Sequence, residues 1–127
     1  MIKKIRLIDM ENQTILYDGL AHINPLKNNG IEYNFENEDR KYTWKVWEKG
    51  MVIRSEADYI LELTLRFNCM TKGHVETEFG ILDLQCKTSL YKIDKNCIEI
   101  QYMLNNDEEQ VFHFILEIDK EEHYVIH

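Results

Sequence analysis

The chain has 127 residues, of which 44% are hydrophobic, and at about 150 residues per domain this length predicts one domain spanning 1–127. Fifteen Lys and Arg against 23 Asp and Glu give a net charge of −8, which disfavours nucleic acid or an anionic membrane as a partner. The chain contains no run of roughly 18 uncharged apolar residues, the length that a membrane span needs. Asp9 and Glu11 interrupt the basic N-terminus before the apolar region of a signal peptide can form. We therefore expect a cytoplasmic protein.

Apolar and polar residues alternate along most of the chain. From Tyr59 to Phe67 every odd position is apolar, and from Ile98 to Leu104 every even position is. This period of two is typical of strands, and no window of about 12 residues shows the apolar stripe of a helix. The pattern predicts an all-β protein of nine or ten strands, which in chain order are 2–10, 14–18, 31–35, 42–47, 52–54, 59–67, 73–77, 81–88, 98–104 and 112–118.

Turn residues separate these segments. Polar clusters at Asn68, 94–96 and 105–107 mark chain reversals. The apolar positions change parity between Val75 and Leu82, so a turn at 78–80 must join two strands as a hairpin. We expect reversals that need positive φ at the five glycines as well, which are Gly19, Gly30, Gly50, Gly73 and Gly80.

Short connections decide between two all-β architectures. A sandwich needs crossings between two sheets, whereas an up-and-down barrel needs only hairpins between neighbours and leaves no exposed edge. The spacing favours a single antiparallel up-and-down barrel of about eight to ten strands. Its expected inward set is Tyr59, Leu61, Leu63, Leu65, Phe67, Leu82, Leu84, Ile98, Ile100, Tyr102, Leu104, Phe112, Phe114, Leu116 and Ile118.

One motif resembles a known family. It reads Gly73-x-Val75-Glu76-Thr77-x-Phe79-Gly80 and is followed by Leu82, Leu84 and Thr88. This is similar to the central motif of the YwiB-like family, uncharacterised bacterial proteins with a calycin-like, lipocalin-type barrel. The likeness covers about residues 1–118 and departs from the family pattern at Glu78 and at Ser55-Glu56-Ala57, both in expected turns. The resemblance implies a calycin-like barrel and no particular activity.

Residues that could carry chemistry form no recognisable site. The cysteines Cys69, Cys86 and Cys97 are odd in number, contain no CxxC and are interpreted as free thiols. His74, Glu76 and Glu78 could hold a cation, but their positions favour a solvent-exposed row. His123 and His127 would stand about 13 Å apart on a strand, too far to share a metal ion. Since nucleophile and phosphate motifs are also missing, we expect no enzyme, catalytic residue, metal or cofactor.

Arg54 is the charged residue with the strongest case for a role in the barrel. It ends an apolar segment near Tyr42, Trp44 and Tyr59. Three interpretations stay open: solvent exposure, closure of a barrel end by stacking on Trp44 or Trp47, or contact with an acidic ligand. Trp44 and Trp47 differ in parity, so one should face inward; the other would form a contact surface or lie beneath a covering loop.

Two functions follow from these patterns. The first is binding of a small apolar or amphipathic ligand in the barrel, with Arg54, Tyr42, Trp44 and Tyr59 as the ligand-binding residues. Because the inward side chains are large, this hypothesis predicts at most a small cavity, with its mouth near these residues. The alternative is a filled barrel that acts as a protein-interaction or structural module, including a homodimer.

Overall fold

The computed structural model describes residues 1–122. This part of the chain contains ten strands and one three-residue 3₁₀ turn at Lys27–Asn29. None of its residues belongs to a helix long and apolar enough to cross a membrane. The strands are β1 (Ile2–Asp9), β2 (Thr14–Pro25), β3 (Ile31–Glu36), β4 (Lys41–Val46), β5 (Gly50–Glu56), β6 (Ile60–Arg66), β7 (Met70–Thr77), β8 (Gly80–Asp94), β9 (Cys97–Leu104) and β10 (Val111–Glu122).

The strands form a closed antiparallel barrel. Each strand pairs with the next along the chain, and β1 closes the ring by pairing with β10. The predicted all-β, up-and-down barrel is therefore confirmed, as is the hairpin between β7 and β8. Closure gives every strand a hydrogen-bonded neighbour on both sides, so a functional site is to be sought on the inner or the outer face of the barrel.

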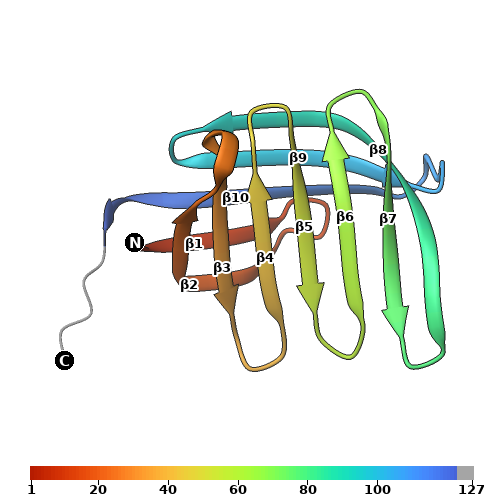
Figure 1. Cartoon of the computed structure of the whole chain (residues 1–127), viewed down its shortest axis with the longest axis horizontal. Coiled ribbons are helices and arrows are strands. Elements are labelled where there is room, and N and C mark those ends of the chain that lie inside the picture. The colour runs from red at the N-terminus through yellow and green to blue at the C-terminus, as the bar shows by residue number, and fades with distance from the viewer. Residues whose placement is uncertain (123–127) are drawn as a thin grey trace.

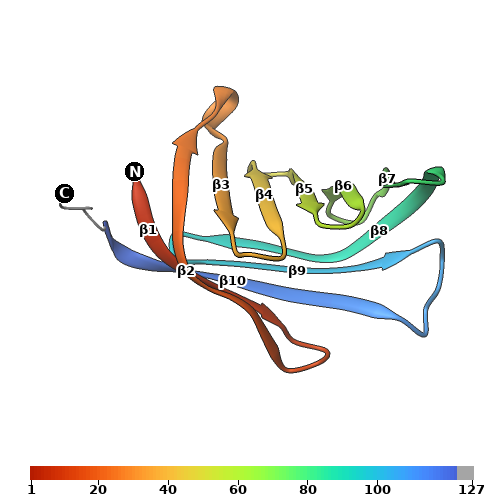
Figure 2. The same cartoon turned by 90° about the horizontal axis from the view of Figure 1, so that it is seen from below.

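The barrel is flattened into two crossed layers (Figures 1 and 2). Strands β3 to β7 run almost perpendicular to β1, β9 and β10. Two long strands connect the layers. β8 pairs with β7 over its first half and with β9 over its second half, with an irregularity between Thr88 and Leu90. β2 likewise pairs first with β1 and then, from His22 onward, with β3. These bends place both strands at the corners where the sheet turns from one layer to the other.

The prediction that every glycine takes a positive φ is wrong for four of them. Among the described glycines only Gly80 does, at φ +130°. Most of the other residues with positive φ are asparagines, because an asparagine side chain can hydrogen-bond to the neighbouring backbone in this conformation. Gly73 instead lies inside β7, where an added Cβ would stand 2.6 Å from Leu63 Cδ2 and 2.7 Å from the Glu62 carbonyl oxygen. Its missing side chain allows β6 and β7 to approach. Positive φ also occurs at Gln13, Asn28, Asn29, Asn68, Asn105 and Asn106.

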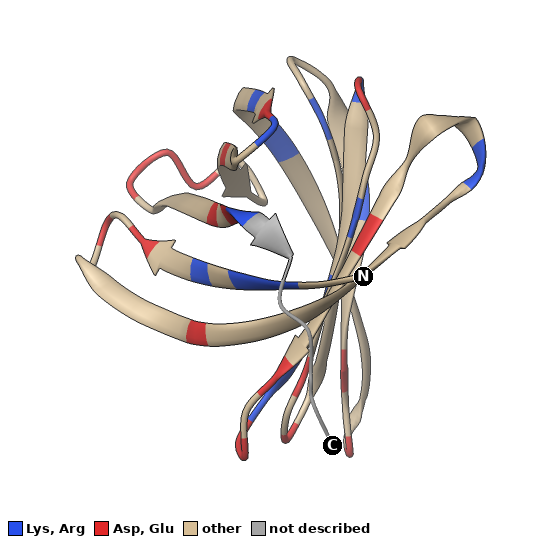
Figure 3. Ribbon diagram, turned by 90° about the vertical axis from the view of Figure 1, so that its left-hand side faces the viewer, with Lys and Arg blue, Asp and Glu red and all other residues tan. Residues whose placement is uncertain are grey.

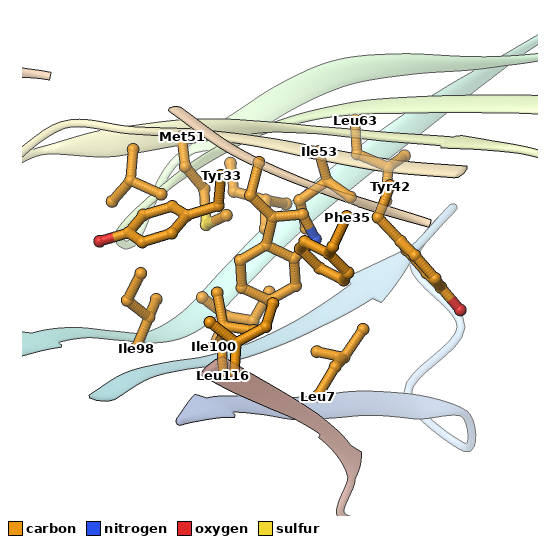
Figure 4. Packing of buried hydrophobic residues seen from close by; sticks show 14 of the residues in the cluster. Leu7, Tyr33, Phe35, Tyr42, Met51, Ile53, Leu63, Ile98, Ile100 and Leu116 are labelled. Atoms are coloured by element: carbon orange, nitrogen blue, oxygen red, sulfur yellow. The ribbon is translucent and has the colours of Figure 1, made fainter. Parts of the chain in front are cut away.

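Most of the predicted inward residues form the core. Figure 4 shows Ile98, Ile100 and Leu116 of one layer facing Met51 and Ile53 of the other. Three predicted members are wrong, since 40% of Tyr59, 55% of Phe67 and 63% of Leu82 is exposed. Tyr59 and Phe67 lie in the turns that flank β6, and Leu82 is close to the turn at 78–79. Alternation in the sequence predicts on which face of a strand a side chain lies. It does not predict where along the strand that face becomes exposed to solvent.

Candidate functional site

A cavity of about 480 Å³ opens at one end of the barrel. It lies between the two layers, at the end that carries the turns 10–13, 37–40 and 105–110. Its volume exceeds the small cavity predicted from the size of the inward side chains. Its apolar wall consists of Leu7, Leu16, Tyr42, Trp44, Ile53, Leu61, Tyr102, Val111, Phe112 and Phe114.

The register across β4, β5 and β6 explains why this end is hollow. Toward the opposite end, Val46, Met51 and Leu65 form a row of paired inward positions, all of them buried. In the row nearest the cavity mouth the central position is the small Ser55, with Tyr42 on one side and Leu61 on the other. Replacing a large apolar residue by serine in the middle of a row removes the atoms that would have filled the space.

The opposite end of the barrel is closed by side chains. The Tyr91 hydroxyl of β8 lies 2.5 Å from the carbonyl oxygen of Trp47 and 2.8 Å from that of Gly50. It thereby holds the β4–β5 turn against the other layer, and burial raises its pKa. Closure at this end thus uses a tyrosine hydroxyl rather than the stacked Arg54 and tryptophan that were considered from the sequence.

The positive charge at the cavity mouth belongs to Arg40. Its Nη1 donates a hydrogen bond of 2.8 Å to Oγ of Ser55, and its guanidinium carbon stands 5.6 Å from the ring centre of Tyr59. The side-chain oxygen of Asn37 accepts from the backbone N–H groups of Asp39 and Arg40, which fixes the turn before β4. Arg40 is therefore held at the mouth by both its backbone and its side chain.

Acidic residues occupy the other side of the mouth. Asp9, Glu11 and Glu109 line it from the β1–β2 and β9–β10 turns. The Asp9 carboxylate accepts hydrogen bonds from the backbone and the side chain of Asn12, at 3.2 and 2.8 Å. Figure 3 shows further Asp and Glu residues at the tips of other turns, at the lower end of the view. The mouth therefore combines one cation with several carboxylates.

Two of the four predicted binding residues line the cavity, and a third lies next to it without forming part of its wall. Tyr42 and Trp44 line its wall, and Tyr59 stands beside Arg40 at the mouth. Tyr42 stacks on Phe35 with ring centres 4.9 Å apart, and burial raises its pKa. Figure 4 shows its hydroxyl pointing away from the packed cluster.

The structure does not bring the fourth residue, Arg54, to the cavity. Its side chain is 38% exposed on the outer face of β5, where Nε lies 2.7 Å from Glu56 and Nη1 lies 2.6 Å from Glu62. These hydrogen bonds raise the pKa of Arg54 and lower that of Glu56. The sequence contained the signal that separates the two arginines. Arg54 alternates with the inward residues of β5, whereas Arg40 shares the parity of Tyr42 and Trp44.

The two tryptophans divide as their parity predicted. Trp44 is 1% exposed in the core. Trp47 lies in the β4–β5 turn, and its Nε1 donates to the carbonyl oxygen of Lys27 at 3.0 Å. A Cβ at Gly30 would stand 2.3 Å from the same nitrogen. The segment 27–30 therefore covers Trp47, in agreement with the covering-loop interpretation and not with an exposed contact surface.

The remaining candidate groups stay apart from the cavity. Cys69 is exposed, Cys86 is buried and Cys97 is half-buried, and none of them is in a disulfide. His74 Nε2 is 3.3 Å from Glu76, while Glu78 lies in the following turn. Within residues 1–122 no three His, Cys, Asp or Glu side chains gather closely enough to hold a metal ion. The predicted separation of His123 and His127 falls outside the described residues.

The fold is similar to that of a solved bacterial protein. The crystal structure of ywiB protein from Bacillus subtilis superposes with a TM-score of 0.63 at 18% sequence identity, covering 92% of this chain and 86% of that chain. This likeness shows a YwiB-like fold, as the resemblance around Gly73–Gly80 implied. No family model matches the chain, and no curated protein matches it.

Proposed function

We propose that this protein is a non-catalytic barrel that binds a small, partly apolar molecule in the cavity between its two layers. The observation that carries the proposal is an open cavity of about 480 Å³ with aromatic and aliphatic walls and a polar mouth. Small-molecule sites are typically concave, mostly apolar and about 300–1,000 Å³ in volume, with a few polar groups that orient the ligand.

The calycin-like assignment and the cytoplasmic location belong to the same proposal. Two crossed layers of an up-and-down barrel around a cavity open at one end are the arrangement expected of a calycin-like binding protein. Three cysteines outside any disulfide fit a reducing compartment. Neither argument depends on which molecule is bound.

Titration with an uncharged fluorophore tests the proposal. N-phenylnaphthylamine fluoresces more strongly in apolar surroundings, so entry into the cavity should give a saturable signal at one molecule per chain. Absence of saturable binding to this probe and to a fluorescent fatty acid would contradict the proposal and favour a barrel that works without a ligand.

Two neighbouring positions provide a matched pair of variants. Leu61→Trp places a larger side chain into the cavity, whereas Ile60→Trp places it on the outer face of the same strand. We expect Leu61→Trp to weaken probe binding by about tenfold or more and Ile60→Trp to leave it close to wild type. Equal binding by the two variants would place the fluorophore outside the cavity.

A second candidate function is association with another copy of the chain through the β7–β8 turn. Phe79 is 91% exposed there, Ile81 68% and Leu82 63%. Neighbouring exposed apolar side chains of this kind are characteristic of contact surfaces. Sedimentation over a range of concentrations should then show a dimer that Phe79→Ser weakens. A monomer at all concentrations would contradict the homodimer.

A further inference from the structure

Arg40 is a cation built into the wall of an apolar cavity. Arg40, Tyr42 and Trp44 alternate along one face of the chain entering β4, and all three line the cavity. The residue is only half-buried, so water reaches part of its guanidinium. Its contacts with Ser55 and Tyr59 keep the side chain at the mouth.

The charge of Arg40 has no carboxylate partner among the described residues. Arg6 pairs with Asp18 at 3.2 Å, and Arg54 pairs with two glutamates. The partner of Arg40 is the neutral hydroxyl of Ser55, which is 6% exposed. A guanidinium carries five N–H donors, and the bond to Ser55 uses one of them. The others are left for water or for a ligand.

We propose that Arg40, steadied by Ser55 and Tyr59, binds the carboxylate of an amphipathic ligand whose apolar part occupies the cavity. This inference rests on the proposed binding function and specifies its ligand class. A planar guanidinium matches a carboxylate through paired hydrogen bonds, and such charge-assisted bonds are among the stronger polar contacts in proteins.

The acidic residues nearby do not reverse this preference. Glu11 and Glu109 are exposed, and the field of exposed charges is screened over about 8 Å at physiological ionic strength. The half-buried Asp9 carboxylate accepts hydrogen bonds from the backbone and side-chain N–H groups of Asn12, at 3.2 and 2.8 Å. Contact with Arg40 takes place at hydrogen-bond distance and is partly shielded from water by Ser55 and the Tyr59 ring. The attraction between a ligand carboxylate and Arg40 therefore outweighs the repulsion from the more distant acidic residues. A ligand amine at the same place would be repelled by the positive charge of Arg40.

Displacement of bound N-phenylnaphthylamine by three ligands of equal chain length tests the inference. Decanoate, decanol and decylamine differ only in the head group, so their ranking reports the charge that the mouth selects. We expect wild-type protein to bind decanoate about tenfold or more tightly than decanol, and decylamine most weakly.

Arg40→Gln removes the charge and keeps a donor for Ser55, and Arg54→Gln makes the same change on the outer face. The preference for decanoate should disappear in Arg40→Gln, with decanol binding retained, and should persist in Arg54→Gln. Equal binding of decanoate and decanol by wild type, preference for decylamine, or loss of the preference in Arg54→Gln would overturn the assignment while leaving a binding cavity. Failure of all three ligands and the probe to bind would contradict the proposed function itself.

Discussion

The two ends of the barrel interior are built from the same strands but differ in how they are filled. At the closed end Met51 and Leu65 are 2% and 0% exposed, and Tyr91 fastens a turn across the two layers. At the open end Ser55 takes the central position, and Leu61 and Phe112 are only partly buried. The same strand register is thus compatible with both a packed core and a cavity. The size of the side chain at individual inward positions determines which of the two forms at each end.

Truncation of equivalent leucines should give the largest difference between the ends. Leu65→Ala empties a fully buried position and should lower the free energy of unfolding by about 2–5 kcal/mol. Leu61→Ala, on the same face of the same strand, borders existing open space and should cost roughly half as much. Urea unfolding of both variants measures the difference. Equal losses would mean that the open end is packed as tightly as the closed one.

The β7–β8 turn depends on one backbone conformation. Gly80 has φ +130°, and an added Cβ would meet no atom within 4 Å, so any cost of Gly80→Val arises from the backbone alone. We expect about 1–3 kcal/mol of destabilisation, visible as a lower Tm. Phe79→Val, which places the same side chain one position earlier, is the control and should change Tm little. Equal Tm values for wild type and Gly80→Val would contradict the strain argument.

The buried thiol of Cys86 should give a smaller, pH-dependent effect. Burial raises its pKa from 9.0 to about 11. The folded state therefore favours the thiol, and its contribution to stability is complete below about pH 9 and is lost as pH rises through about 11. The stability difference between wild type and Cys86→Ala should shrink over that interval. A constant difference would show that Cys86 titrates normally.

Labelling of the thiols checks the same point independently. In the folded protein at pH 8 the exposed Cys69 should react quickly and Cys86 slowly, because Cys86 is buried and its raised pKa disfavours the reactive thiolate. Under denaturing, non-reducing conditions the number of labelled thiols should rise to three. A final count of one would reveal a disulfide.

The hydroxyl of Tyr91 should make the smallest contribution. Tyr91→Phe removes its contacts with the carbonyl oxygens of Trp47 and Gly50 while keeping the ring, so the expected cost is about 0.5–1.5 kcal/mol. Tyr59→Phe is the control at the open end, since its exposed hydroxyl makes no hydrogen bond to a described residue. If both changes cost the same, the hydroxyl of Tyr91 does not fasten the closed end.

Much of this fold follows from the local pattern of the sequence. Strict alternation identified the all-β class, and short connections with a parity change before Gly80 identified hairpins and an up-and-down barrel. The same alternation required one of Trp44 and Trp47 to face inward. It also contained the distinction between Arg40 and Arg54, although the aromatic residues near Arg54 in sequence favoured Arg54 as the binding residue. Applying the parity of β5 to Arg54 would have placed it on the outer face.

Only the tertiary structure determined where the interior is hollow and where the strands bend. β2 and β8 extend beyond their predicted bounds because each continues from one layer into the other, and no local pattern records that bend. The cavity depends on side chains from β1, β2, β4, β5, β6, β9 and β10 that meet across the layers. Alternation tells which side of a strand a residue faces, since it is a property of neighbours in sequence. The space left between opposing faces depends on residues far apart in sequence, and so it is decided only when the barrel closes.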